Sequence, residues 1–298
     1  MDNHREVRIR IRTSGEVVAE RVFGEKELRF LYENPFGKRL THWVLRREPL
    51  NHVYGWFQRR RSSRKRIPEF VRKLGIDVEE AERPLEEYTS LDDFFTRRLK
   101  TAARPIDTAP EHLLSPADGR TLVYPRVDGT LRVKASEVTI SDLLGDPALA
   151  ERYQGGAAAV VRLAPADYHR FHFPEGGTAS ESVRHGRGLH SVHTIALEAG
   201  APSFRNKRMI CRLATEAFGE LILIEVGALI VGTMVQRYMP GRVERGQEKG
   251  YFRFGGSTVI LLAEPGRVVF DDDLVRDSAD GLEVLLKMGS RIGRRIQT

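Results

Sequence analysis

The chain has 298 residues, 41% of them hydrophobic and 30% charged, which suits a folded globular protein and excludes wholesale disorder. A single cysteine, Cys211, excludes an internal disulfide and a cysteine-based zinc site and favours a reducing compartment. The net charge is +7, and the stretch from Gly37 to Lys73 holds twelve Lys or Arg residues against two acids. This basic stretch predicts an acidic partner surface, either anionic lipid or nucleic acid.

Residues 1–109 are predicted to form an N-terminal, largely helical, basic region. Alternating apolar and basic residues before Phe23 indicate a short strand or hairpin. Farther on, four apolar residues have the spacing of an amphipathic helix flanked by arginines: Leu50, Val53, Tyr54 and Phe57. This face could pack on the rest of the protein or lie in a membrane interface, and both interpretations stay open. Nucleic acid is the least favoured partner, because the aromatic residues share a helical face instead of being spaced for base stacking.

Residues 110–298 are predicted to form a β-rich domain. Just before this domain, Ser90 followed by Asp93 three positions later predicts the start of a helix. Beyond Pro110, strand-like runs occur at 121–124, 130–133, 157–163, 220–225, 228–235, 258–263 and 267–270, with a short helix at 140–144. The apolar run at 221–235 is too short to span a bilayer and contains Glu225, so it is interpreted as two buried strands. The expected class is α+β, with the helical region against a mostly antiparallel β body.

Three local sequences have the residue types that chemistry requires. The first, Ser115-Pro116-Ala117-Asp118-Gly119, is by itself typical of a tight turn. The second runs from Pro165 to Pro174 and holds His169 and His172, which could be a metal pair, an acid/base pair or core histidines. A metal site needs a third ligand, and none is evident, so no metal is expected.

The third local sequence runs from Glu248 to Ile260 and places Gly255 and Gly256 before Ser257, at the start of an apolar strand. This pattern is consistent with a bulge or a phosphate-binding turn. It is also consistent with a strained Gly-Ser bond whose carbonyl lies open to attack by the serine's own oxygen, since glycine has no side chain to obstruct it.

Taken together, these motifs resemble the phosphatidylserine decarboxylase family over most of the chain. The resemblance includes Tyr54-Gly55, Ser63 to Ile67, Tyr88 to Lys100, Arg104-Pro105-Ile106-Asp107 and the three local sequences in their expected order. Gly-Gly-Ser-Thr preceded by Glu-Lys-Gly-Tyr-Phe is similar to the longer bacterial subgroup. The chain departs from the family pattern at Val192-His193-Thr194, where an Asn-Pro pair is expected after the valine.

The resemblance implies a self-processing, pyruvoyl-dependent enzyme. Asp118, His172 and Ser257 would form a charge-relay triad that cuts the Gly256–Ser257 bond, giving a β chain, 1–256, and an α chain that starts at 257. Ser257 would become the covalent pyruvoyl cofactor, which forms a Schiff base with the substrate amine. His169 would serve the decarboxylation step, with the division of work between the two histidines left open.

The resemblance also implies substrate and location. Phosphatidylserine would be converted to phosphatidylethanolamine and CO2, a step of phospholipid biosynthesis. The protein would lie on the cytoplasmic face of the cell membrane as a peripheral protein. No nucleic acid is expected as a partner, and a homodimer is left open. A related serine-headed ether lipid is the alternative substrate, and a non-enzymatic basic binding module, which predicts an uncut chain, is the alternative class. For phosphate contacts, surface solvation is favoured over binding at Arg205, Lys207 and Arg208.

Overall fold

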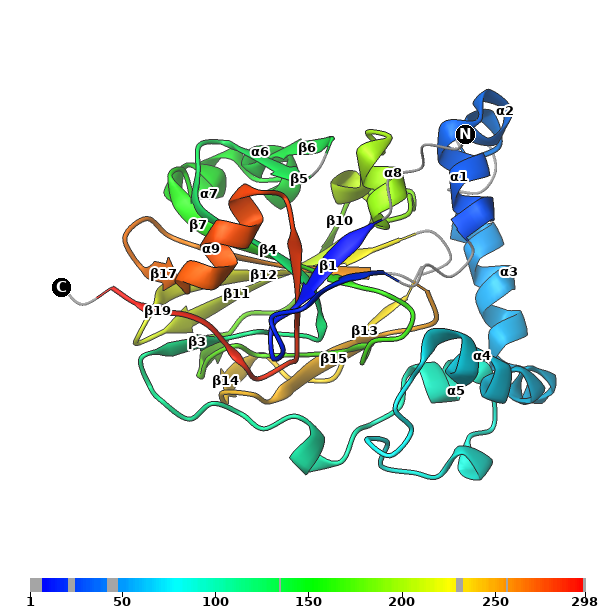
Figure 1. Cartoon of the computed structure of the whole chain (residues 1–298). Coiled ribbons are helices and arrows are strands. Elements are labelled where there is room, and N and C mark those ends of the chain that lie inside the picture. Colours follow the sequence, from blue (N-terminus) through cyan, green and yellow to red (C-terminus); the bar gives the residue numbers. More distant parts are fainter. Residues whose placement is uncertain are drawn as a thin grey trace.

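The computed structural model describes residues 7–20, 25–41, 48–133, 135–228, 233–255 and 257–296. It confirms an α+β protein with a mostly antiparallel, β-rich body (Figure 1). The main sheet has eleven strands. Ten follow one another in the order β14 (Gly241–Val243), β9 (Gly177–Ala179), β11 (Arg208–Thr215), β12 (Gly219–Gly227), β16 (Ser257–Ala263), β7 (Gly156–Leu163), β4 (Gly119–Val127), β18 (Glu283–Leu286), β1 (Arg8–Ile11) and β2 (Val17–Ala19), and β10 (Val183–His185) pairs with β11.

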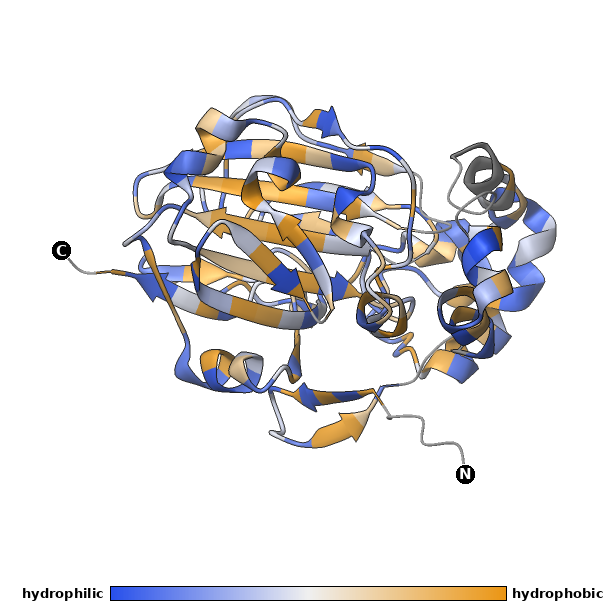
Figure 2. Cartoon of the chain, turned by 90° about the horizontal axis from the view of Figure 1, so that it is seen from above, coloured by the Kyte–Doolittle hydropathy of each residue, from blue (hydrophilic) through white to orange (hydrophobic). Residues whose placement is uncertain are grey.

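The central strands of this sheet are buried on both faces. Along β12, Leu221 and Leu223 belong to one apolar core, whereas Ile222 and Ile224 belong to another on the opposite face. One face packs on α9 (Asp272–Ala279) and on the strands β3 (His112–Leu114), β17 (Val268–Phe270) and β19 (Arg291–Arg295). The other is covered by α6 (Ile140–Leu144), α7 (Pro147–Arg152) and the hairpin of β5 (Thr130–Val133) and β6 (Ser136–Thr139). Burial on both sides explains why these strands have continuous apolar sequences (Figure 2).

A smaller sheet carries the second local sequence. Its order is β13 (Met234–Gln236), β15 (Glu248–Phe252) and β8 (Arg170–His172). Lys249 of β15 ties this sheet to the main one, because its Nζ lies 2.8 Å from a carboxylate oxygen of Glu225 on β12, and both side chains are fully buried. The same Nζ donates to Ser182 and Gln236.

The helices of the N-terminal region lie along one side of the molecule (Figure 1). They are α1 (Glu25–Glu33), α2 (Pro35–Leu40), α3 (Glu48–Arg59), α4 (Ile67–Leu74) and α5 (Leu91–Phe95), with 3-10 helices at Arg61–Arg66, Leu85–Glu87 and Thr101–Ala103. A further 3-10 helix, Ser203–Arg205, belongs to the β body. The cap predicted at Ser90 is confirmed, since its hydroxyl accepts a hydrogen bond from Asp93 N at 3.1 Å. Among the residues described, no helix is both long and apolar enough to cross a membrane.

Contacts join the N-terminal region to the β body. Strand β1 pairs in parallel with β18, and β1 with β2 forms the predicted hairpin. Helices α4 and α5 share an apolar cluster with Phe254, three residues before Ser257. The division between residues 109 and 110 stays a prediction. The strands expected at 121–124 and 130–133 form, but they do not pair with each other, since β4 pairs with β7 and β18 and β5 pairs with β6.

Candidate active site

Ser257 opens the central strand β16 and is fully buried. It pairs with Gly227 of β12 on one side and with Leu163 of β7 on the other. Gly255 has φ +134°, a backbone conformation that favours glycine, so the chain enters the strand through a bend closed to other residues. Gly256, the other half of the predicted cleavage site, lies outside the described residues. The serine hydroxyl is thus held at the start of a strand that is paired on both sides.

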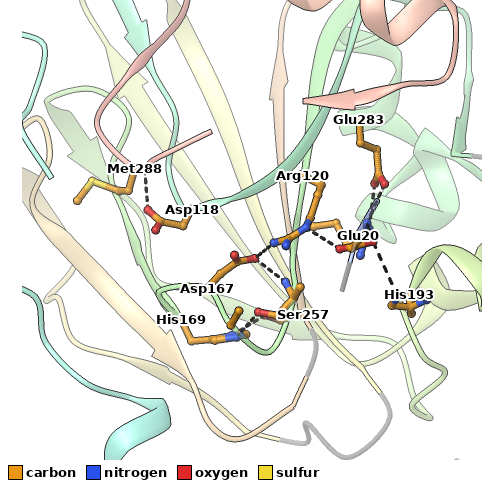
Figure 3. Close-up of polar contacts among 12 residues, drawn as sticks. Glu20, Asp118, Arg120, Asp167, His169, His193, Ser257, Glu283 and Met288 are labelled. Atoms are coloured by element: carbon orange, nitrogen blue, oxygen red, sulfur yellow. Dashed lines mark hydrogen bonds and ion pairs between the residues drawn. The ribbon is translucent and has the colours of Figure 1, made fainter. Parts of the chain in front are cut away.

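His169 is the histidine whose ring contacts Ser257 (Figure 3). Its Nδ1 lies 3.4 Å from the Ser257 Oγ, and its Nε2 lies 3.0 Å from the Ala164 carbonyl oxygen. A carbonyl only accepts, so Nε2 carries the proton and Nδ1 offers a lone pair to the hydroxyl. The ring stacks on Phe95 of α5, with centroids 3.9 Å apart. Burial lowers the pKa of His169 to about 3, so its ring is neutral near pH 7.

His172 and Asp118 lie in neighbouring segments, with other partners. The His172 amide donates to Pro116 O at 2.8 Å, which brings the first two local sequences together, and its Nδ1 is buried with no hydrogen-bond partner among the described residues. Burial lowers the pKa of His172 to about 4. The Asp118 carboxylate instead accepts hydrogen bonds from the Arg104 Nε at 2.8 Å and from the Met288 amide at 2.8 Å. The structure thus brings His169 to Ser257, while the roles expected of the triad stay predictions.

The close approach of two strands sets the position of Asp118. A side chain at the next residue, Gly119, would bring its Cβ to 2.6 Å from the Arg162 carbonyl oxygen on β7, so β4 and β7 meet only because this residue is glycine. The Asp-Gly pair that is typical of a turn in the sequence therefore also serves a packing contact.

A buried chain of charged groups holds the loop before His169 (Figure 3). Asp167 accepts the Ala164 amide at 2.7 Å and is ion-paired with Arg120. Arg120 in turn lies 2.6 Å from Glu20, which comes from the end of the N-terminal hairpin. The backbone of Ala164 is therefore held at its N–H group by Asp167 and at its carbonyl oxygen by His169. Sequence reasoning assigned no role to Asp167 or Arg120, although both lie within two residues of predicted site residues.

The unexpected Val192-His193-Thr194 sequence belongs to the same network. His193 caps α8 (Thr194–Glu198) by accepting the Ile195 amide at 3.2 Å, and its Nε2 lies 3.9 Å from Glu20. Thr194 donates to Glu283, which also binds Arg162. The loop whose shape the family pattern left open is thus a capped helix start, packed beside Glu20.

The arginines considered as phosphate contacts have other partners. Arg205 forms an ion pair with Asp142 at 2.7 Å in an exposed position. Lys207 likewise interacts with another residue of the chain. Arg208 is buried, and its three guanidinium nitrogens bond the carbonyl oxygens of Leu143, Asn206 and Asp142. Its hydrogen bonds therefore serve the fold.

Comparison with known proteins identifies the family of the chain. The family described as phosphatidylserine decarboxylase matches residues 91–294, a span that includes Asp118, His169, His172 and Ser257. The chain belongs to the phosphatidylserine decarboxylase family. A phosphatidylserine decarboxylase proenzyme of Fusobacterium nucleatum is 42% identical over 286 residues, 95% of each chain. The proenzyme of Chlamydia felis is 42% identical over 96% of this chain and 97% of its own length. That of Desulfitobacterium hafniense is 40% identical over 93% of this chain and 94% of its own length.

This family assignment makes the chain a decarboxylase and confirms the resemblance drawn from the motifs. The match begins at Leu91, the first residue of α5, so it includes the helix that supplies Phe95 to the His169 ring. Helices α1 to α4 precede it, whereas the relatives align along nearly all of the chain.

Proposed function

We propose that this member of the family decarboxylates phosphatidylserine to phosphatidylethanolamine and CO2 with a pyruvoyl group that it makes from Ser257. The observation that carries the proposal is the buried Ser257 hydroxyl, which faces the lone pair of a neutral histidine at the start of a fixed strand. The neutral ring presents a lone pair to the hydroxyl proton, which is the arrangement that a general base requires. The names of the relatives supply the substrate class.

The residues fit a cofactor made in place. Because the group would derive from Ser257, it needs no cradle of its own, and the fully buried position keeps bulk water from it. Once formed, the ketone would act as an electron sink for the substrate, joined through the substrate's amine. His169, the side chain in contact with position 257, would then hold and deliver the proton that the substrate α-carbon takes up.

Self-cleavage would proceed from the same serine. The Ser257 oxygen would attack the Gly256 carbonyl carbon, and its proton would pass to His172, the role that the family resemblance assigns to this residue. The same proton would go on to the Ser257 nitrogen as the Gly256–Ser257 C–N bond breaks, which leaves an ester. A base would then remove the Cα proton of residue 257 as the Gly256 carboxylate leaves from Cβ, which gives a Cα–Cβ double bond. Transfer of the amine proton to Cβ would convert this enamine to an imine. Hydrolysis consumes one water and releases ammonia, so the atoms balance with no oxidant or reductant.

Replacing the serine tests this proposal. Ser257→Ala should run as a single full-length chain in denaturing electrophoresis and show no decarboxylation, because it lacks the oxygen that attacks. Ser14→Ala, at an exposed serine, is the matched control and should give fragments 1–256 and 257–298 with full activity. Decarboxylation by the Ser257→Ala protein would refute the assignment of the cofactor.

We also propose that the N-terminal helices hold the protein on the cytoplasmic face of the cell membrane as a peripheral protein. Five large apolar side chains on α1, α2 and α3 are exposed: Phe30, Phe36, Val53, Trp56 and Phe57. The guanidinium of Arg60 lies 4.0 Å from the centre of the Trp56 ring, so cationic and aromatic groups share this surface. Apolar insertion together with attraction to anionic headgroups is the usual mode of interfacial binding.

Vesicle co-sedimentation tests the membrane proposal. Wild type should bind vesicles with 30% phosphatidylglycerol more tightly than neutral phosphatidylcholine vesicles, and the double variant Trp56→Glu/Phe57→Glu should lose most of that binding. Val269→Glu replaces an exposed apolar residue on β17, on the far side of the molecule from α3, and should bind as wild type does (Figure 1). Equal binding by all three proteins would contradict the proposal.

A further inference from the structure

Arg97, two residues after α5, is a buried guanidinium with unused donors. It is 5% exposed, and its Nη2 donates to the carbonyl oxygens of Ala166 at 3.0 Å and Asp167 at 3.4 Å. Its Nε and Nη1 are buried and have no hydrogen-bond partner among the described residues. The guanidinium carbon lies 5.0 Å from the centre of the Phe94 ring, which compensates part of the charge but gives Nε and Nη1 no acceptor. Buried donors without acceptors cost free energy, so native proteins seldom leave them unpaired.

Other arginines around the site differ from Arg97 in having carboxylate partners. Arg104 pairs with Asp118, Arg120 with Asp167 and Arg170 with Glu248. In the part of the chain that the structure describes, no carboxylate lies within ion-pairing distance of Arg97. The nearby acids are therefore already neutralised, and the charge balance around the site has room for one more anion.

The position of Arg97 places this charge beside the loop that carries His169. Its Nη2 bonds the same loop, Ala164 to His169, that fixes the His169 ring through Ala164 O. Phe95, two residues before Arg97, stacks on that ring. In agreement, burial is the largest cause of the lowered pKa of His169, and the positive charge of Arg97 lowers it further, whereas the Ala164 contact raises it.

We propose that Arg97 binds the phosphodiester of the substrate headgroup through its Nε and Nη1 edge. The inference rests on the proposed function, whose substrate carries two anions, a carboxylate and a phosphodiester. A cation held against the carboxylate would stabilise a charge that disappears as CO2 forms, and this would favour the ground state over the transition state. The phosphodiester keeps its charge throughout, and two parallel N–H groups of a guanidinium match its oxygens.

The experiment compares two substrates that differ at the phosphate. Short-chain phosphatidylserine and an O-alkyl serine of equal chain length share the amine and the carboxylate, and both are presented in the same detergent micelles. The variants are Arg97→Met, Arg97→Lys and the control Arg98→Met, at the exposed neighbouring arginine. Electrophoresis first establishes that each variant is cut, so that losses of kcat/KM refer to processed enzyme.

Arg97→Met should lose roughly 10- to 100-fold in kcat/KM on phosphatidylserine and little on O-alkyl serine, because hydrogen bonds to charged groups have about this strength. Arg97→Lys should retain part of the activity, and Arg98→Met should match wild type on both substrates. Equal losses on both substrates would place Arg97 on the carboxylate or in the fold, and unchanged activity on phosphatidylserine would also overturn the inference. Wild type inactive on phosphatidylserine would instead refute the proposed function.

A second measurement does not depend on processing. Calorimetric titration measures the affinity of the uncut Ser257→Ala protein for short-chain phosphatidylserine. Adding Arg97→Met to this protein should weaken that affinity by about 10-fold or more. Adding Arg98→Met instead should leave the affinity unchanged. Equal affinities for the Arg97 and Arg98 variants would overturn the assignment even if Arg97→Met were not cut.

Discussion

One peptide carbonyl decides which nitrogen of His169 faces Ser257. Because Ala164 O accepts a hydrogen bond from the protonated Nε2, the lone pair of Nδ1 points at the hydroxyl. Burial keeps the ring neutral. His172 lacks such a partner at Nδ1 among the described residues and lies beside Pro116. The two histidines of one short motif therefore have different environments, which is the basis for giving them different tasks.

We expect His172→Ala to remain a single chain and His169→Ala to be cut but to lose decarboxylation by roughly 10²- to 10⁴-fold, the usual contribution of a positioned acid or base. Electrophoresis scores the first property, and CO2 release from purified, cut protein scores the second. A His169 variant that stays uncut would assign the serine's proton to His169, in line with its contact.

Asp167 supports the His169 loop through one amide and one ion pair, both buried. Asp167→Asn can still accept the amide but leaves Arg120 with Glu20 alone, so we expect a loss of about 3 kcal/mol in the free energy of unfolding and slower self-cleavage. Urea unfolding of Ser257→Ala with and without the change measures the first. Asp146→Asn, at the exposed cap of α7, should cost little, because aspartate and asparagine cap equally well.

The sequence predicted the residue types of the site better than their contacts. Local motifs identify Ser257, His169, His172 and Asp118, because each lies in a short run with an unusual pattern. Which histidine touches the serine depends on the turn between β7 and β8, and spacing alone does not encode it. Glu20 carried no signal, since a single carboxylate after a short hairpin looks like surface until Arg120 and Arg162 surround it.

Secondary structure elements with local signals were predicted well. The helix at 140–144 has the predicted bounds, and the run at 157–163 agrees with β7 within one residue. Strand partners were not predicted, because pairing such as β1 with β18 joins residues at opposite ends of the chain. The apolar run at 221–235, interpreted as two buried strands, gives the buried end of β12 and the start of β13, which is only partly buried, and residues 229–232 lie outside the described residues.

The ion pair between β15 and β12 predicts a specific stability pattern. Lys249→Met leaves Glu225 buried without its cation and should lower the free energy of unfolding by about 3–5 kcal/mol in the Ser257→Ala background. The double change Lys249→Met/Glu225→Leu should recover most of that loss, since an apolar pair of similar volume can replace a buried ion pair. A double variant as unstable as the single one would show that the neighbouring hydrogen bonds of Lys249 matter more.

Three histidines buried in the neutral state make the whole molecule sensitive to acid. Burial lowers the pKa to about 3 for His169 and to about 4 for His172 and His193. The unfolded chain binds these protons near pH 6.5, whereas the folded chain does so only near pH 3–4. Between these values the unfolded state holds more protons, so stability is complete above about pH 6.5 and falls as the pH decreases.

Thermal unfolding of the Ser257→Ala protein checks this expectation. Tm should be nearly flat from pH 8 to 7 and should fall steadily from pH 6 to 4. His193→Asn should flatten part of that decline, whereas His185→Asn, at a partly exposed histidine, should reproduce the parent curve. A Tm that stays constant down to pH 4 would contradict neutral burial.

The position of Ser257 in the sheet decides what a cut before it would leave behind. The segment from 257 onward supplies β16 to the middle of the main sheet, β18 beside β1 and β4, and β19 beside β3. Its strands are interleaved with those of the longer piece, so scission would release no free peptide and the halves would separate only on denaturation. The fold would therefore not depend on the Gly256–Ser257 bond, and the new terminus would stay where the serine had been.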